Sequence, residues 1–79
     1  MLIIIEKVNL NIFYENGKLR EVLYFINNKI EGERKYYNEN GQLKNICNYI
    51  NGKEEGEYKT FYENGDLKEV SYYINGIKQ

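Results

Sequence analysis

Short runs of Tyr, Phe, Ile and Val alternate with polar residues along most of the chain, and most runs end at an Asn-Gly or Asn-Asn pair. Alternation of this kind, with aromatic and β-branched enrichment, is typical of half-buried strands, and the runs are too short for helices. Asn-Gly is also a strong hairpin signal. The pattern predicts an all-β chain with strands near residues 8–14, 19–26, 32–38, 43–50, 56–62 and 67–74, and allows a further strand over Leu2 to Glu6.

The pattern repeats three times. The stretches "FYENGKLREV", "YNENGQLKNI" and "FYENGDLKEV" place Gly17, Gly41 and Gly65 at a spacing of 24 residues, and a second turn series ("INN", "ING", "ING") follows the same spacing. Three units at residues 8–31, 32–55 and 56–79 therefore tile the chain behind an N-terminal segment, residues 1–7, which we interpret as a cap or extra strand. A period of this size is typical of arrays in which each unit contacts mainly its neighbours.

The first turn of each unit fixes the strand register. A three-residue Glu-Asn-Gly loop, with a left-handed Gly in a bulge, would place Phe61 opposite Leu67, an aromatic–aliphatic pair. The same loop predicts that Phe13 faces Leu19 and Tyr37 faces Leu43. It also predicts three more pairs: Lys59 with Glu69, Tyr58 with Val70, and Leu10 with Val22. A two-residue Asn-Gly loop would instead place Lys59 opposite Val70 and Phe61 opposite Lys68, and we favour the three-residue loop.

Several positions recur in every unit, and we interpret them as a packing ladder. They form four series: Phe13, Tyr37 and Phe61; Leu19, Leu43 and Leu67; Val22, Ile46 and Val70; and Phe25, Tyr49 and Tyr73. The turn glycines permit positive φ. They are Gly17, Gly41, Gly65, Gly52 and Gly76. Asn28 stands where the second turn of the other units has Gly, and Asn tolerates the left-handed region well.

Four tyrosines are the candidate interaction residues, namely Tyr14, Tyr24, Tyr62 and Tyr72. The middle unit has Asn38 and Asn48 at the corresponding positions. A pure packing ladder should tolerate such polar replacements poorly, whereas an exposed binding stripe can vary. Tyr also suits protein interfaces, because it combines an apolar body with a polar tip.

Nothing in the composition indicates catalysis or a cofactor. The chain has one cysteine and no histidine, so neither a Cys-His pair nor a metal site built on Cys and His can form. We interpret Cys47 as a small filler, because Leu23 and Ser71 hold its position elsewhere. Glu15, Glu39 and Glu63 are expected to be solvated turn residues rather than a cation site. The net charge of −1, with interspersed charges, disfavours nucleic-acid binding.

The N-terminal stretch "MLIIIEKV" is too short for a membrane span and lacks the features of a signal peptide. The default expectation is a cytoplasmic protein, although a fragment of a secreted protein would show the same pattern. The richness in Asn, Ile, Tyr and Lys hints at an AT-rich bacterial genome.

The repeated residues resemble the bacterial variant of the MORN repeat, which has a Gly, an aromatic, a Tyr-x-x-Asn-Gly turn, Leu-Lys and a second turn. The matched positions in the last unit are Gly56, Tyr58, Phe61, Tyr62, Asn64, Gly65, Leu67, Lys68, Asn75 and Gly76. The first unit departs from the pattern at Val8 and Asn28, as an N-terminal cap would. The resemblance implies an elongated single-layer antiparallel meander of stacked hairpins and a non-catalytic role. Proteins with this variant are often labelled antitoxins of toxin–antitoxin systems.

Three functions follow as hypotheses. The first is a scaffold for protein–protein interaction, in its narrower form an antitoxin that binds a partner toxin. The second is a membrane-surface module, which the matched numbers of acidic and basic residues disfavour. The third is self-association through the edge strands or through the apolar segment Leu2 to Ile5, because an unpaired sheet edge invites pairing with another chain.

Overall fold

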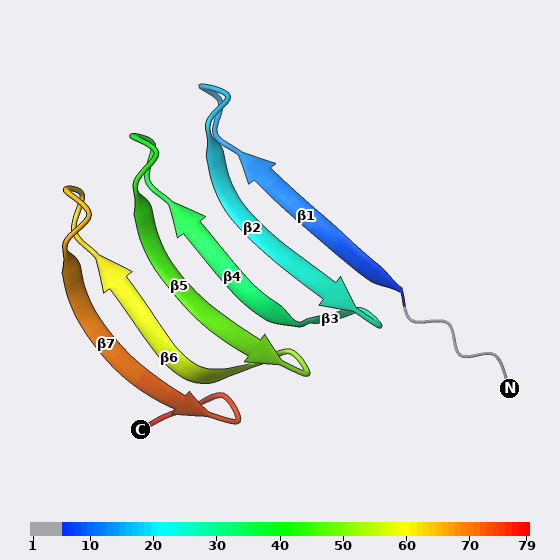
Figure 1. The fold of residues 1–79 in the computed structure, drawn as a ribbon. Coiled ribbons are helices and arrows are strands. Elements are labelled where there is room, and N and C mark those ends of the chain that lie inside the picture. Colours follow the sequence, from blue (N-terminus) through cyan, green and yellow to red (C-terminus); the bar gives the residue numbers. More distant parts are fainter. Residues whose placement is uncertain (1–5) are drawn as a thin grey trace, which may run out of the picture.

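Eight strands form one open antiparallel sheet in the structure, a computed structural model that describes residues 6–79. They are β1 (Lys7–Phe13), β2 (Leu19–Ile26), β3 (Lys29–Ile30), β4 (Gly32–Tyr37), β5 (Leu43–Ile50), β6 (Lys53–Phe61), β7 (Leu67–Ile74) and β8 (Ile77–Lys78). The long strands follow chain order across the sheet, and β3 and β8 pair with the ends of β2 and β7. Figure 1 shows three curved hairpins stacked side by side, with all first turns at one end of the sheet.

The predicted fold class, an all-β single-layer meander, is confirmed. The six expected strands are all present, and the two-residue strands β3 and β8 are additions that follow the second turns. The molecule measures 50 × 35 × 13 Å, so it is one sheet thick. The expected strand over Leu2 to Glu6 falls on residues 1–5, which lie outside the described range, and on Glu6, which is not in a strand.

The first turn of each unit is the predicted three-residue loop. In the third unit the Tyr62 N–H donates to the Asp66 carbonyl over 2.8 Å, and the Gly65 N–H donates to the Tyr62 carbonyl over 2.9 Å. Gly65 has a φ of 95°, which favours glycine. Phe61 faces Leu67, Phe13 faces Leu19 and Tyr37 faces Leu43, as predicted.

Beyond these pairs the predicted register is wrong by one residue. Lys59 faces Val70 instead of Glu69, and Tyr58 faces Ser71 instead of Val70. In the first unit, Leu10 faces Leu23 and not Val22. The cause is a β-bulge directly after the Phe–Leu pair, where one strand carries an extra residue without an opposite partner. The extra residues are Arg20, Lys44 and Lys68.

The second turns are two-residue loops in which both central residues have positive φ. Asn51 and Gly52 have φ values of 53° and 81°, the arrangement of a type I′ turn. Asn28 takes the place of Gly at φ 66°, as expected. Each of the later turns also contacts the preceding unit, since the Gly52 N–H donates to the Ile30 carbonyl and the Gly76 N–H to the Glu54 carbonyl, both over 2.9 Å.

Strand alternation and the register divide the side chains between two faces. The aromatic face carries, from β1 to β7, Leu10, Ile12, Glu21, Leu23, Phe25, Arg34, Tyr36, Cys47, Tyr49, Tyr58, Glu69, Ser71 and Tyr73. The charged face carries Val22, Tyr24, Glu33, Lys35, Ile46, Asn48, Glu57, Lys59, Val70 and Tyr72. Among the described residues only Leu23, Cys47 and Glu21 are buried, at 4%, 5% and 5% exposure.

Candidate interaction surfaces

A polar cluster lies on the aromatic face between the first two units. The Arg34 Nε–H on β4 donates to a carboxylate oxygen of Glu21 on β2, and Arg34 Nη2 forms an ion pair with the same oxygen. The Arg34 guanidinium also lies over the Tyr49 ring, 5.9 Å from its centroid. This cluster holds the buried Glu21 carboxylate in an ion pair and joins β2, β4 and β5, so it serves the cohesion of the array.

Burial sets the protonation states around this cluster. It opposes the charge on Arg34, but hydrogen bonds with Glu21 and Tyr49 outweigh it and raise the pKa of the guanidinium. Burial also raises the pKa of the Cys47 thiol, and of the Tyr49 and Tyr58 phenols. Cys47 is therefore a protonated thiol at neutral pH, which is the inert form.

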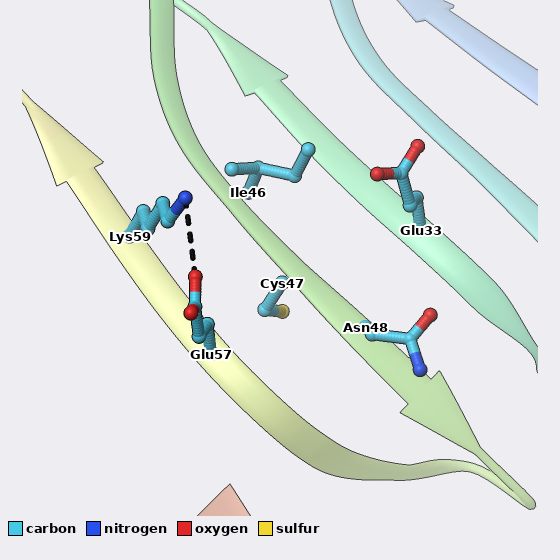
Figure 2. Close-up of a pocket in the computed structure, with 6 residues that line it drawn as sticks. All are labelled: Glu33, Ile46, Cys47, Asn48, Glu57 and Lys59. Carbon is cyan, nitrogen blue, oxygen red and sulfur yellow. Dashed lines mark ion pairs between the residues drawn. The ribbon is translucent and has the colours of Figure 1, made fainter. Parts of the chain in front are cut away.

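The charged face has a shallow hollow of about 330 Å³ over the middle unit. Figure 2 shows the residues around it: Ile46 and Asn48 on β5, Glu33 on β4, and Glu57 and Lys59 on β6, together with Cys47, whose side chain belongs to the aromatic face. The carboxylates pair with neighbouring ammonium groups, Glu57 with Lys59 over 3.1 Å and Glu33 with Lys35 over 3.9 Å. The charges around the hollow are therefore balanced in pairs.

Tyr24 and Tyr72 lie on the charged face, at its two ends. Three strands separate them, so about 19 Å lies between β2 and β7 at ~4.8 Å per strand. Asn48 holds their position in the middle unit, and its shorter side chain forms part of the hollow. Tyr72 is 55% exposed, whereas Tyr24 is half-buried beneath the Lys7 ammonium, 5.1 Å from its ring centroid.

Tyr14 and Tyr62 lie at the first turns, away from the other two tyrosines. The Tyr14 hydroxyl donates to the Tyr37 carbonyl of the next unit over 2.5 Å. Tyr62 holds the same position in the last unit and is 52% exposed. The four predicted tyrosines therefore form two separate pairs rather than one stripe, and their role in binding stays a prediction.

Sequence reasoning missed the bulge residues and the Glu21–Arg34 pair. Each bulge side chain is basic and lies within 6.0 Å of a tyrosine ring centroid: Arg20 over Tyr14, Lys44 over Tyr36 and Lys68 over Tyr62. Basic residues at one phase of all three units are a signal that could have been noticed. The Glu21–Arg34 pair offered none, because the second and third units have Asn45 and Tyr58 at the corresponding positions.

The turn residues lie at the predicted positions. The five predicted turn glycines all have positive φ, between 81° and 95°. The Glu15, Glu39 and Glu63 carboxylates lie at exposed first turns, and within residues 6–79 no group of acidic or thiol side chains is arranged to hold a metal ion. The described part of the chain also contains no helix able to cross a membrane.

Most exposed apolar side chains lie at the two outer edges of the sheet. On the first edge strand they are Val8, Leu10 and Phe13, and around the last they are Leu67, Tyr72, Ile74 and Ile77. The other two among the described residues are Tyr62 at a first turn and Ile50 at the end of β5. Leu19 and Leu43, the equivalents of Leu67, are half-buried because a following unit covers them. The edges therefore expose surface that interior units bury against one another.

The repeats match a known family in phase and in number. The family described as MORN repeat variant matches residues 11–27, 30–51 and 54–75, which together make up most of the chain. No curated protein and no solved structure shows a significant match. The three matched segments coincide with the three stacked hairpins, and the chain therefore belongs to the MORN repeat variant family.

Proposed function

We propose that this chain is a non-catalytic scaffold that mediates protein–protein interaction. The observation that carries the proposal is the open single layer: the sheet is 13 Å thick, and only three described residues are buried. A sheet normally buries one face against a second layer. Here both faces and the edges offer surface to a partner, and extended surfaces of this kind are what repeat arrays use for binding.

The candidate contact residues are the exposed Tyr62 and Tyr72, together with their less exposed repeat equivalents, Tyr14 and Tyr24. Exposed tyrosines are enriched at interfaces because their rigid rings bury large areas at low entropic cost. In the narrower form of the proposal the partner is a toxin, which the chain neutralises by binding. The charge pairs on the charged face offer no net basic patch for anionic lipid, so nothing there supports membrane binding.

Co-purification from the native host tests the proposal. A tagged chain should retain a specific protein, and Tyr62→Ala with Tyr72→Ala should release it, because both side chains are half exposed and do not support the sheet. Glu57→Gln is the matched control and should keep the partner. For the antitoxin form, the partner expressed alone should arrest growth and co-expression of the chain should restore it. Recovery of no specific protein would contradict the proposal.

Self-association is a second candidate, favoured by the exposed apolar residues at both edges. Edge strands present unpaired backbone groups, which readily pair with a second copy. Light scattering should then show a mass that grows with concentration. A constant monomer mass at high concentration would rule this candidate out.

A further inference from the structure

The outer edge of β7 is half covered. β8 pairs with Tyr73 and Ile74, and the Gln79 N–H donates to the Tyr72 carbonyl over 2.8 Å. Backbone groups alternate sides along an antiparallel strand, so Val70 also points its N–H and carbonyl outward, as Tyr72 does. No strand among residues 6–79 pairs with this edge from Leu67 to Ser71. We call this stretch the open edge.

In the first and second units, the corresponding edge pairs with a strand of the next unit. Along β2, Val22 faces Lys35 of β4, and along β5, Ile46 faces Lys59 of β6. Val70 is the third member of that apolar series. Each interior edge therefore takes a strand that brings a lysine opposite the apolar residue. The residue before that lysine is Arg34 in β4 and Tyr58 in β6.

Two side chains at the open edge are left without the contacts that their equivalents make. Glu21 is buried under Arg34 of the next unit, but Glu69, at the same position, has 60% of its side chain exposed and only Lys78 nearby at 3.8 Å. The Tyr14 hydroxyl donates to the carbonyl of Tyr37 in the next unit. The Tyr62 hydroxyl has no such acceptor within the described residues.

We propose that the open edge binds the first strand of a MORN-type unit supplied by another protein chain. The strand that fits carries Arg, Lys, an aromatic and a second aromatic in succession, as β4 does. In the register of β4 against β2, the lysine would face Val70 and the arginine would reach Glu69. The carbonyl of the second aromatic would accept a hydrogen bond from the Tyr62 hydroxyl. This is strand addition to a sheet edge, with the backbone supplying affinity and the side chains specificity. This inference rests on the proposed scaffold function, because it specifies which kind of protein segment the scaffold would bind.

A second copy of this chain fits the open edge poorly. Its outermost strand, β1, has Leu10 and Asn11 where β4 has Arg34 and Lys35. Glu6 also holds the same repeat position as Lys78, three periods of 24 residues later. In a second copy, Glu6, the residue directly before β1, would therefore coincide with Lys78 of β8.

Peptides copied from the chain itself provide the probes. The peptide GERKYYNEN (residues 32–40) represents the fitting strand, and VNLNIFYEN (residues 8–16) represents β1. Each is titrated in excess into the full ¹⁵N-labelled chain, and backbone amide shifts are followed. The first peptide should shift the Val70 and Ser71 amides in a saturable way, and the second should bind at least about tenfold more weakly. Equal binding of both peptides, or shifts away from β7, would overturn the proposal.

Conservative substitutions locate the contact. Tyr62→Phe in the chain should weaken binding of GERKYYNEN about threefold to tenfold, the effect of one lost hydrogen bond. Arg34→Ala in the peptide should weaken it by a similar factor, and much less against a Glu69→Gln chain, because the two changes remove the same pair. Tyr36→Phe in the chain, on the interior strand β4, is the matched control and should leave binding unchanged. Additive effects of the paired changes would contradict the register.

The peptide result and the native-host result separate the two proposals. If GERKYYNEN binds the open edge but no host protein is recovered, the edge inference stands and the scaffold function fails. If a host protein is recovered whose binding survives both Tyr62→Phe and Val70→Pro, the function stands and the edge inference fails. Val70→Pro removes the outward N–H, and circular dichroism must show that this variant keeps its sheet.

Discussion

At the residue scale, the Glu21–Arg34 pair is the ion pair that holds a buried carboxylate. Arg34→Met would keep an unbranched apolar stem but leave the buried Glu21 carboxylate without its cation. Because the Arg34 side chain is 34% exposed, we expect a loss of about 2–3 kcal/mol in unfolding free energy, below the 3–5 kcal/mol typical of fully buried pairs. Urea denaturation measures this loss.

Two controls define the source of that loss. Adding Glu21→Gln to Arg34→Met should recover part of the stability, since no unpaired charge then remains. Lys35→Met removes an exposed cation on the opposite face and should change stability by less than about 1 kcal/mol. Similar losses for Arg34→Met and Lys35→Met would contradict the assignment.

The buried Cys47 thiol and the half-buried Tyr49 and Tyr58 phenols make the fold sensitive to alkali. Burial raises the folded-state pKa of Cys47, Tyr49 and Tyr58 above their unfolded values, so the folded state holds on to these protons longer. Their contribution is therefore complete below about pH 8.5, the ordinary thiol pKa, and is lost as the pH rises through the folded values. Thermal unfolding should show a falling midpoint above that pH. Cys47→Ala should flatten the first part of the fall, and an unchanged slope would contradict the prediction.

At the element scale, the Tyr14 hydroxyl connects the first hairpin to the second. Tyr14→Phe removes the hydrogen bond to the Tyr37 carbonyl and should cost about 1 kcal/mol in unfolding free energy. Tyr62→Phe is the matched control, because Tyr62 holds the same repeat position at the open edge, and it should be nearly neutral. Chemical denaturation of the two variants measures the difference, and equal costs would mean that the Tyr14 bond contributes nothing.

The first turns depend on glycine for conformation rather than for space. Gly41 has a φ of 93°, and a Cβ added there would meet no atom within 4 Å. Gly41→Ala should therefore cost about 1–2 kcal/mol through backbone strain alone. Gly41→Asn should cost less, since Asn tolerates the left-handed region, and the ratio of the two losses in thermal denaturation checks this. A neutral Gly41→Ala would show that the loop adopts another turn.

The hairpins also show which part of the fold could be predicted from sequence. The turn length and the pairing of Phe61 with Leu67 follow from Asn-Gly and an aromatic–aliphatic match, both local signals. The bulge at Lys68 shifts the following pairs. Its sequence signal is a basic residue that recurs at this position in all three units, and that signal does not by itself specify an extra residue. The contact between Tyr14 and Tyr37 has a different cause. It depends on how neighbouring hairpins stack, so neither hairpin alone could predict it.

At the scale of the whole molecule, the array is held together by contacts between adjacent units. The Glu21–Arg34 pair, the Tyr14 hydroxyl and the second-turn glycine N–H groups all join one unit to the next. All three buried residues lie on β2 and β5, which have strands on both sides. The repeat period predicted the stacking, and the second-turn glycine bonds recur with it at Gly52 and Gly76. The Glu21–Arg34 pair and the Tyr14 hydrogen bond do not recur between the second and third units, so they left no periodic trace.

This distribution predicts a gradient of stability across the sheet. Units in a linear array are stabilised by their neighbours, so strands with two neighbours should open less often than edge strands. Among hydrogen-bonded amides, exchange should be slowest in β4 and β5 and faster in β1 and β7, whereas outward-facing edge amides such as that of Val70 are unprotected in either case. Exchange measured by NMR, residue by residue, distinguishes this gradient from a single cooperative opening. In a single opening, the hydrogen-bonded amides of β4, β5 and β7 would all exchange with the same opening free energy. Saturation with the GERKYYNEN peptide should then slow exchange at Val70 selectively, because the added strand turns an edge into an interior position.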